Sequence, residues 1–285
     1  MTAIRQLTRN DYQQVLDMQT GIEDDYVIRL FPQLIENPAQ TLYGLETEGR
    51  LAAVAGVVRM PNGNGILGRL RSDIRYQSNG HATALLQKII ADCEQNSNMH
   101  WVGAITQKSN MPAQRVLDKL GLQQADQFIS LLMESPDMTL AAGAQPWQQV
   151  TGNEAKRDAI EQAVLETQRA FYPYEAYFPI PFASAVLEDD YLEQLAVFQD
   201  PNSSKMMALQ EDYKGRALAQ IQYFWSDLFE QDGLWAAVFD YINKSDKLLT
   251  PQVDVSPETA SSMPDAFKPC FVANDDPWLI YGISI

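Results

Sequence analysis

The chain has 285 residues, 46% of them hydrophobic, and a formal net charge of −16 at pH 7. This length exceeds the usual size of one domain, so two domains with separate cores are expected. The acidity disfavours nucleic acid and anionic membranes as partners, because phosphate groups attract clustered Lys and Arg. It favours a neutral or cationic partner, although solubility alone is the simpler explanation of the same charge.

No apolar run approaches the roughly 18 to 20 residues of a membrane span, and the first residues lack the apolar stretch of a secretory signal. We therefore expect a cytoplasmic protein. Cys93 and Cys270 fit no metal or redox spacing and are expected to be small buried hydrophobes. Only His81 and His100 could add imidazole ligands, so no metal site is predicted.

The first elements in chain order are a short strand at residues 3–7 and a helix that begins with the capping pattern of Thr8 and Asp11. The acidic residues 23–25 lead into a second helix, which Asn37 and the following proline end. Strand-like runs separated by turn sequences come next, at residues 41–46, 51–60 and 65–74. The turn chemistry between these runs predicts an antiparallel meander.

A polar loop at residues 77–80 follows the meander, and later elements alternate between helix and strand. They are a helix with an apolar face at residues 85–93, a buried strand at 100–105, a short helix from Asn110 to Gly121 and a strand at 128–133. Glycine at position 121 is the residue type that commonly ends a helix. The first 135 residues are thus expected to fold as an α+β domain.

Between Glu134 and Trp147 the composition changes to Ser, Pro, Gly and Ala, which suits a connector. We therefore predict domains at residues 1–135 and 146–285. The second region begins with a helix at 153–171, and the Pro-rich aromatic run 171–182 cannot be regular helix. Strand candidates there are residues 194–198, 206–209, 217–225, 234–239 and 278–285. This α/β domain is expected either to cover the substrate-acceptor site of the first domain or to be a degenerate copy of the first fold.

Residues 70–82 have the pattern of a ligand loop, because a strand ends, a tight polar turn follows and a helix begins at or after Gly80. Free backbone N–H groups and the positive helix end then meet at one point, which suits a pyrophosphate. Gly80 lets the backbone approach the phosphate, and the small Ala82 keeps the helix start close to it. Such turns are common, so the loop alone does not define the ligand.

The segment Gln77-Ser78-Asn79-Gly80-His81-Ala82 matches the [Arg/Gln]-x-x-Gly-x-[Gly/Ala] motif of the GNAT superfamily of N-acetyltransferases, after the fourth strand as in that family. Asn110, Ala113, Lys119 and Gly121-Leu122 resemble a later motif of the same family. The resemblance implies a mixed, mainly antiparallel sheet flanked by helices, followed by the second domain. It also implies acetyl-CoA as co-substrate and direct transfer of the acetyl group to the amine of a small molecule.

By this resemblance, acetyl-CoA lies in a splay between the fourth and fifth strands. Backbone groups near Leu70 and Ser72 would pair with its pantetheine arm, and Asn110 would face the arm from the other side. The residues whose amides would hold the pyrophosphate are Gln77, Ser78, Asn79, Gly80, His81 and Ala82. Arg71 and Arg75 flank the loop and could neutralise coenzyme phosphates.

The chain departs from the family at its proton-handling positions, where Gly68 stands for the usual glutamate and Leu117 for the usual tyrosine. Glu23, Asp24 and Asp25 lie where the family places its acceptor pocket, and we predict that they recognise the amine or remove its proton. The alternative is an acidic helix start stabilised by the helix dipole.

A narrower resemblance, to the histidine N-acetyltransferase-like branch, rests on Gly21-Ile22-Glu23, the aromatic second helix, Glu48-Gly49-Arg50 and Leu70-Arg71. It implies an amino acid as acceptor. Two other functions stay open: a non-catalytic acyl-CoA sensor, and acetylation of protein N-termini or lysines. The aromatic run 171–182 would either wall an acceptor pocket or pack the second core. The sequence leaves the oligomeric state open, with a homodimer as the arrangement considered.

Overall fold

The structure is a computed structural model that describes residues 2–77, 79–273 and 276–285. The chain divides into two compact units, unit 1 with Met1–Asp126 and Leu279–Ile285, and unit 2 with Gln127–Trp278. This division differs from the predicted connector at residues 135–146, because the last strand of the chain returns to unit 1. The predicted boundaries, at residues 1–135 and 146–285, thus remain a prediction.

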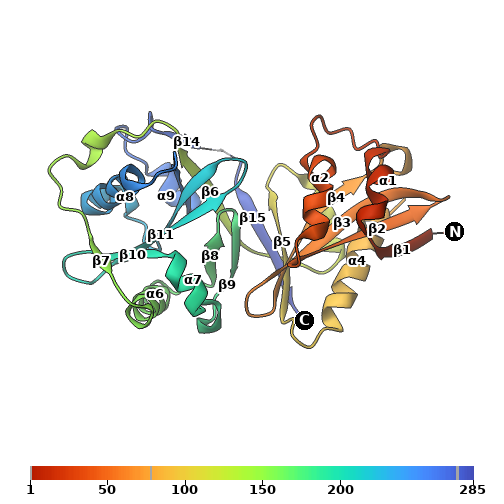
Figure 1. Ribbon diagram of the computed structural model, residues 1–285, viewed down its shortest axis with the longest axis horizontal. Helices are drawn as coiled ribbons and strands as arrows, with labels where there is room; N and C mark the ends of the chain where they lie inside the picture. The colour runs from red at the N-terminus through yellow and green to blue at the C-terminus, as the bar shows by residue number, and fades with distance from the viewer. Residues whose placement is uncertain (1, 78, 274–275) are drawn as a thin grey trace. The chain divides into compact units, whose positions relative to one another are not determined.

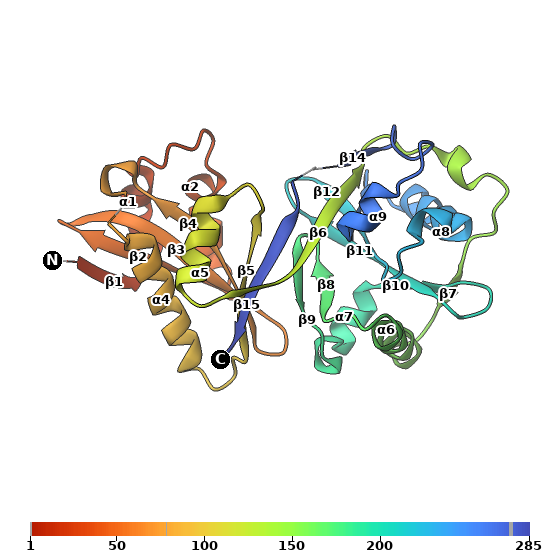
Figure 2. The ribbon, with the colours of Figure 1, turned by 180° about the vertical axis from the view of Figure 1, so that it is seen from behind.

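Unit 1 is a sheet with helices on both faces (Figures 1 and 2). Its elements are β1 Thr2–Gln6, η1 Arg9–Asp11, α1 Tyr12–Leu16, α2 Tyr26–Arg29, α3 Phe31–Glu36, β2 Gln40–Thr47, β3 Arg50–Met60, β4 Asn64–Ser72, η2 Ile74–Tyr76, α4 His81–Glu94, β5 Trp101–Gln107, α5 Met111–Lys119 and β15 Trp278–Ser284. The strand order is β1-β2-β3-β4-β5-β15. Strands β1 to β4 are antiparallel neighbours, whereas β4 and β5 are parallel. The predicted α+β fold with its antiparallel meander is confirmed.

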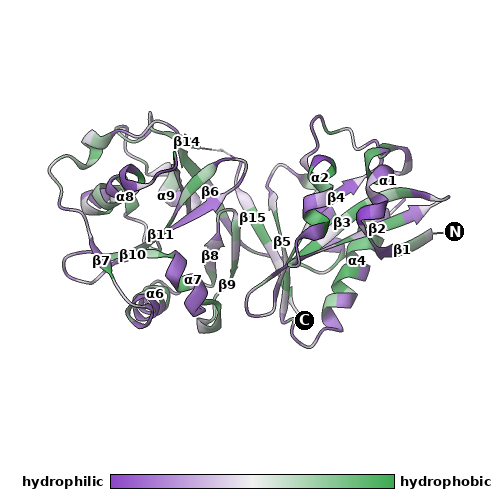
Figure 3. Cartoon of the chain, viewed as in Figure 1, coloured by the Kyte–Doolittle hydropathy of each residue, from purple (hydrophilic) through white to green (hydrophobic). Residues whose placement is uncertain are grey.

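The two faces of this sheet have separate apolar cores. Helix α4 packs Leu85, Leu86 and Ile89 against β2 to β5, and Figure 3 shows hydrophobic and hydrophilic patches alternating along this helix. On the other face, α1 to α3 contribute a second cluster around Phe31, which is fully buried. Amphipathic helices are expected to bury such a stripe against a sheet. The loop between β4 and α4 therefore leads from the sheet to the face opposite α1 to α3.

Local sequence signals account for most helix ends in unit 1. The predicted capping box is present, since the Thr8 backbone N–H donates to Asp11 Oδ2 at 2.7 Å. The single helix predicted after residue 25 is two short helices, α2 and α3. Pro32 lies in the first turn of α3, where its missing N–H costs nothing, but inside a continuous helix it would remove a hydrogen bond.

The C-terminal strand β15 is part of the unit 1 core, where it neighbours β5. Leu279 and Tyr281 are buried there, and the Ile285 N–H donates to the His100 carbonyl at 3.0 Å. The indole of Trp101 lies across two glycines. A Cβ on Gly103 would come within 1.9 Å of the indole, and one on Gly282 within 2.3 Å. Only glycine leaves room for this ring at the junction of β5 and β15.

Gly282→Val should destabilise unit 1 by about 1 to 3 kcal/mol, the usual cost of overpacking, because the new side chain meets the Trp101 ring. Urea unfolding followed by tryptophan fluorescence measures the change. Ser284→Val, at an exposed site on the same strand, is the matched control and should change stability by less than about 0.5 kcal/mol. Equal stability of the two variants would contradict the placement of β15 beside β5.

Unit 2 is a second sheet with helices on both of its faces. Its elements are β6 Gln123–Met133, which crosses from unit 1 into unit 2, η3 Met138–Ala141, β7 Gln148–Val150, α6 Asn153–Thr167, β8 Phe171–Glu175, β9 Phe178–Pro181, η4 Ser184–Val186, α7 Asp189–Gln194, β10 Ala196–Gln199, β11 Met206–Tyr213, β12 Ala217–Gln222, η5 Leu228–Glu230, α8 Asp232–Lys244, β13 Thr250–Val255, α9 Pro257–Ser261 and β14 Phe271–Ala273. The strand order is β7-β10-β11-β12-β13-β6, with β14 also paired to β6.

The order of pairings in unit 2 repeats that of unit 1. Antiparallel neighbours lead to one parallel pair, β12 with β13, and helix α8 connects the two parallel strands as α4 connects β4 to β5. The predicted strand at residues 234–239 is wrong, because these residues lie in α8. An apolar run this short fits a strand or a buried helix equally well, and α8 buries Trp235 and Val238 completely. The aromatic run 171–182 forms the hairpin of β8 and β9.

Candidate coenzyme and acceptor site

Strands β4 and β5 separate in the second half of their length. In the described residues their register runs from Asn64↔Trp101 to Leu67↔Ala104, although β4 continues to Ser72. Arg69 adopts the left-handed conformation with φ of 58°, and the register of β4 with β3 shifts at the same place. Such a bulge bends a strand. Residues 68–72 of β4 therefore lie beyond the paired part of the β4–β5 edge.

The predicted coenzyme residues Leu70 and Ser72 lie on this diverging part of β4. Both are partly buried, and Ser72 still pairs with Ala53 of β3 on the other edge. A strand edge of this kind can hydrogen-bond an extended ligand as it would another strand. At Gly68, no heavy atom of the described chain lies within 4 Å of the position that a Cβ would take. The missing glutamate of the family thus corresponds to open space.

Asp73, directly after β4, holds the loop that leads to α4. Its carboxylate is fully buried and accepts hydrogen bonds from the backbone N–H groups of Gln19 at 3.1 Å and Arg75 at 2.9 Å. The Arg75 side chain donates to the same carboxylate, with Nε at 2.8 Å from Oδ1. These bonds, led by that of Arg75, lower the pKa of Asp73 to about 2. Asp73 is absent from the residues predicted from the sequence, although an Asp that directly follows a strand is a known turn signal.

Gly80 is the N-cap of α4 and has a φ of 74°, a conformation that glycine adopts without strain. His81 and Ala82 are the first residues of the helix, where backbone N–H groups have no acceptor in the preceding turn. Gln77 and Asn79 are exposed, and Ser78 lies outside the described residues. No heavy atom described by the structure comes within 4 Å of a Cβ built on Gly80, so the helix start can accept a phosphate.

Asn110 lies at the same edge of the sheet, because β5 runs parallel to β4 and also leads into a helix. Its Oδ1 accepts the Ala113 N–H at 3.3 Å and so caps α5. The carboxyl ends of two adjacent parallel strands, each followed by a helix start, are the usual ligand position in a sheet of this kind. The structure therefore brings together Leu70, Ser72, Gly80, His81, Ala82 and Asn110 at one edge.

The three predicted acidic residues have different surroundings. Asp25 is buried, caps α2 through the Val27 N–H and accepts a hydrogen bond from Arg71 Nε at 2.6 Å. Asp24 is exposed and pairs with Arg29 Nε at 3.1 Å. Glu23 is exposed and has no hydrogen bond or ion pair within the described part of the chain. Of the three, the carboxylate of Glu23 is the one that is not engaged in holding the fold.

Arg71 and Arg75, which flank the loop, are occupied with protein carboxylates. Besides Asp25, Arg71 contacts the Leu70 carbonyl and lies 5.3 Å from the Tyr26 ring centre. Burial counteracts the effect of Arg71, but the net pKa of Asp25 is lowered, so this ion pair is charged at neutral pH. The two arginines thus fix the loop and α2.

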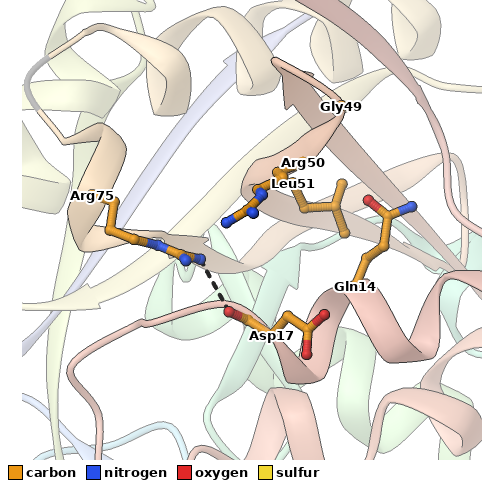
Figure 4. Close-up of a pocket in the computed structure, with 6 residues that line it drawn as sticks. All are labelled: Gln14, Asp17, Gly49, Arg50, Leu51 and Arg75. Carbon is orange, nitrogen blue, oxygen red and sulfur yellow. Dashed lines mark hydrogen bonds between the residues drawn. The ribbon is translucent and has the colours of Figure 1, made fainter.

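A polar pocket of about 490 Å³ lies on unit 1 beside α1 and the turn between β2 and β3. Gln14, Asp17, Gly49, Arg50, Leu51 and Arg75 line it. Figure 4 shows the guanidinium groups of Arg50 and Arg75 extending toward one another in that view, with a hydrogen bond from Arg75 to the Asp17 carbonyl. None of these lining residues is on β5 or α4. Through Arg75, however, the pocket adjoins the β4–α4 loop.

Among the residues of unit 2 that the structure describes, the loop equivalent to β4–α4 is filled by protein atoms. After β12 the chain runs through Asp227, whose carboxylate accepts hydrogen bonds from Lys205, Tyr223 and Gln231. Gly233, in the first turn of α8, faces Trp147 and Gln145, since a Cβ there would lie 2.7 Å from the Trp147 ring. Protein atoms thus fill the start of α8, and the coenzyme features are found in unit 1.

Residues 1–122 match the family model described as the acetyltransferase (GNAT) family. No curated protein matches the sequence. Among solved structures, a protein from Thermoplasma acidophilum described as a candidate acetyltransferase has a TM-score of 0.60 at 13% identity, over 99% of this chain and 100% of that one. A GCN5-related N-acetyltransferase from Sphaerobacter thermophilus has a TM-score of 0.55 at 12% identity, covering 99% of this chain and 95% of that one. A tandem GNAT protein from the clavulanic acid biosynthesis pathway has a TM-score of 0.53 at 10% identity, covering 100% of this chain and 98% of that one.

These structural similarities show that the whole chain has a two-unit GNAT fold. The match of residues 1–122 to the GNAT acetyltransferase family indicates an acyltransferase of this type. Both cysteines are free and buried, as predicted. None of the described helices is long and apolar enough to cross a membrane.

Gly80→Glu should abolish acetyl-CoA binding while the fold is kept, because it directs a carboxylate into the open space at the start of α4. Calorimetry with acetyl-CoA measures the affinity. The control is Gly215→Glu in unit 2, another glycine at positive φ with open space around its Cβ position, which carries the same backbone strain and charge. An unchanged affinity of the Gly80 variant would show that the coenzyme binds elsewhere.

Asp25→Asn should destabilise unit 1 by about 1 to 3 kcal/mol, because Asn still caps α2 but leaves the largely buried Arg71 without its anion. Urea unfolding measures the change, and Asp24→Asn at the exposed neighbouring site is the control. Because the pKa of Asp25 is lowered in the fold, its contribution is present above about pH 4 and is lost as the pH falls further. A difference between wild type and variant that grows at low pH would contradict the ion pair.

Proposed function

We propose that the protein transfers the acetyl group of acetyl-CoA directly to the amine of a small molecule, with one coenzyme site, in unit 1. The observation that carries this proposal is the separated edge of β4, which continues through the Asp73 loop to the open start of α4. A strand edge suits the amide-containing pantetheine arm, and a helix start suits the pyrophosphate.

The fit of acetyl-CoA to this edge is supported at the two glycines. At both Gly68 and Gly80, a Cβ would meet no heavy atom of the described residues within 4 Å. Space for a ligand thus exists beside the strand and at the helix start. Arg71 and Arg75 are held by Asp25 and Asp73, so we expect the phosphates to be bound by the N–H groups of residues 80–82.

Proton removal from the amine is the step for which the chain lacks the usual residues. Leu117 is 4% exposed and belongs to the unit 1 core, so it handles no proton, and a tyrosine there would overpack the core. Gly68 leaves room for water at the position of the family glutamate. We propose that the proton leaves through water at Gly68 and that Glu23 attracts the amine. Asp24 and Asp25 are proposed to shape the segment that carries Glu23.

An amino acid acceptor, as in the histidine N-acetyltransferase-like branch, is the narrower form of this proposal. The second candidate function is a non-catalytic acyl-CoA sensor, favoured by the absence of an acid and a base at positions 68 and 117. Turnover separates the two functions. Release of free CoA that depends on an added amine supports the enzyme, whereas tight acetyl-CoA binding with no such release supports the sensor.

Gly68→Glu should raise the acetylation rate at pH 7 several-fold, because it supplies a carboxylate in open space where the family places a base. A well-positioned general base typically raises a reaction rate by about 100-fold to 10,000-fold, so a several-fold gain is a modest expectation. The rate of CoA release, measured from pH 6 to pH 10 against polyamines and amino acids, should rise steadily with pH in the wild type and level off earlier in the variant. Gly68→Gln has the same shape without the base and should behave like the wild type. Identical profiles for all three proteins would place the reacting amine away from Gly68.

A further inference from the structure

One face of the unit 2 sheet is polar although it is buried. Five polar side chains on four adjacent strands, none more than 8% exposed, share this part of the fold: Ser130, Gln210, Gln220, Gln222 and Gln252. The apolar residues that alternate with them, such as Ile221 and Val253, belong to the core under α8. Buried polar groups destabilise a fold unless they are hydrogen-bonded. Each of these five side chains therefore needs hydrogen-bond partners within the fold.

Half of this polar face is a closed network. Tyr172 donates to Gln222 Oε1 at 2.6 Å, and the amide of Gln222 donates to Tyr191 at 2.9 Å and to the Pro173 carbonyl at 3.0 Å. Gln210 Oε1 accepts from Tyr191 and Gln222. Each of these acceptor oxygens has a donor within hydrogen-bond distance, so this half of the face has a structural role.

The other half contains acceptor oxygens that no donor of the described residues satisfies. They are Oε1 of Gln220, Oε1 of Gln252 and Oδ2 of Asp254, and all three atoms are buried. Gln220 and Gln252 are direct partners on the parallel strands β12 and β13, and Asp254 follows two residues along β13 on the same side. Adjacent strands lie about 4.8 Å apart, so the three oxygens belong to neighbouring side chains.

The orientation of the two amides is fixed by their other contacts. Gln220 Nε2 donates to the Pro173 carbonyl at 3.0 Å, and Gln252 Nε2 donates to Asp254 Oδ1 at 2.6 Å. A carbonyl and an ionised carboxylate only accept hydrogen bonds, so each amide turns its nitrogen to them and its oxygen away when Asp254 is ionised. The unsatisfied atoms are thus acceptors in both cases.

Asp254 is a buried carboxyl group with no basic partner in the described chain. Burial raises its pKa to about 7, and the groups that oppose this shift are the Ser130 hydroxyl, the Tyr177 backbone and the Gln252 amide, none of them a cation. A carboxylate in such a place is costly unless a positive group joins it. Buried polar groups without hydrogen bonds are rare in native folds, and a bound positive group would account for those found here.

The turn above Asp254 is strained. Tyr177, between β8 and β9, has a φ of 67°, which an aromatic residue adopts only when its surroundings impose it. This conformation brings its backbone to Asp254 and its side chain to Ser130. Strained residues gather at ligand sites. The strain and the three unsatisfied oxygens are independent observations at the same place.

We propose that the polar face of unit 2 at Asp254, Gln252 and Gln220 binds the protonated amine of a ligand. An ammonium group has three N–H donors and a positive charge, and this face offers three unsatisfied acceptor oxygens, one of them on the Asp254 carboxylate. Because the unsatisfied atoms are acceptor oxygens, this face favours a donor group over an anion. The strongly negative chain also attracts cations from solution. This binding is independent of the proposed function, which places the reacting amine at Glu23 and Gly68 of unit 1.

Calorimetry of the full-length protein tests the site with 1,4-diaminobutane, tyramine and argininamide as cationic probes, and with 1,4-butanediol as the uncharged match of the diamine. At least one cationic probe should bind with a Kd below about 1 mM, and the diol should not bind. Asp254→Asn should weaken that binding at least tenfold and leave acetyl-CoA affinity unchanged. Asp246→Asn, an exposed site in the same unit, removes the same charge and should leave both affinities unchanged.

A thermal unfolding experiment separates a ligand site from a structural one. Asp254→Asn should unfold at the same temperature or a higher one, because it removes a buried charge that lacks a cation. Gln220→Leu is the second variant; it should also weaken binding, and the Pro173 carbonyl keeps its hydrogen bond from Gln222. Absence of binding by every cationic probe, or equal binding by wild type and both variants, would overturn the site. Amine binding without amine-dependent CoA release would keep the site and reject the proposed function.

Discussion

The separation of β4 from β5 is the feature on which the rest of unit 1 depends. Two parallel strands that stayed paired to their ends would leave no free edge, but the bulge at Arg69 turns β4 away after Leu67. The free edge then continues into a loop whose geometry is set by one buried carboxylate, that of Asp73. The backbone groups of this edge are therefore placed by a strand distortion and a local ion pair.

Both units have the same order of strand pairings, yet they differ in chemistry at equivalent places. In unit 1 the helix after the fourth strand begins at Gly80 with open space, whereas in unit 2 the helix α8 begins against Trp147. The polar residues of unit 2 lie on the sheet itself, around Gln252 and Asp254. The ligands that we propose for the two units are accordingly of opposite charge, a phosphate at a helix start and a cation at a set of acceptors.

The surroundings of Arg71 and Arg75 reflect the small number of basic side chains in this acidic protein. With 21 Lys and Arg against 37 Asp and Glu, carboxylates compete for every guanidinium. Arg71 and Arg75 are bound by Asp25 and Asp73, and these pairs hold α2 and the loop against β4. These two ion pairs therefore stabilise the loop and α2, and we expect backbone N–H groups to contact the proposed ligand.

Signals within a few residues were enough to predict the capping box at Thr8, the antiparallel meander and the helix start at Gly80, because each depends on neighbours in the chain. The structure alone decided the features that depend on distant segments. Asp25 meets Arg71 across 46 positions, and residues 234–239 are helical because the unit 2 core encloses them. The unsatisfied oxygens of Gln220 and Gln252 become neighbours only through strand register, and β15 joins β5 only because two glycines leave room for Trp101. Contacts between distant segments depend on the complete packing of the chain, which local propensities do not specify.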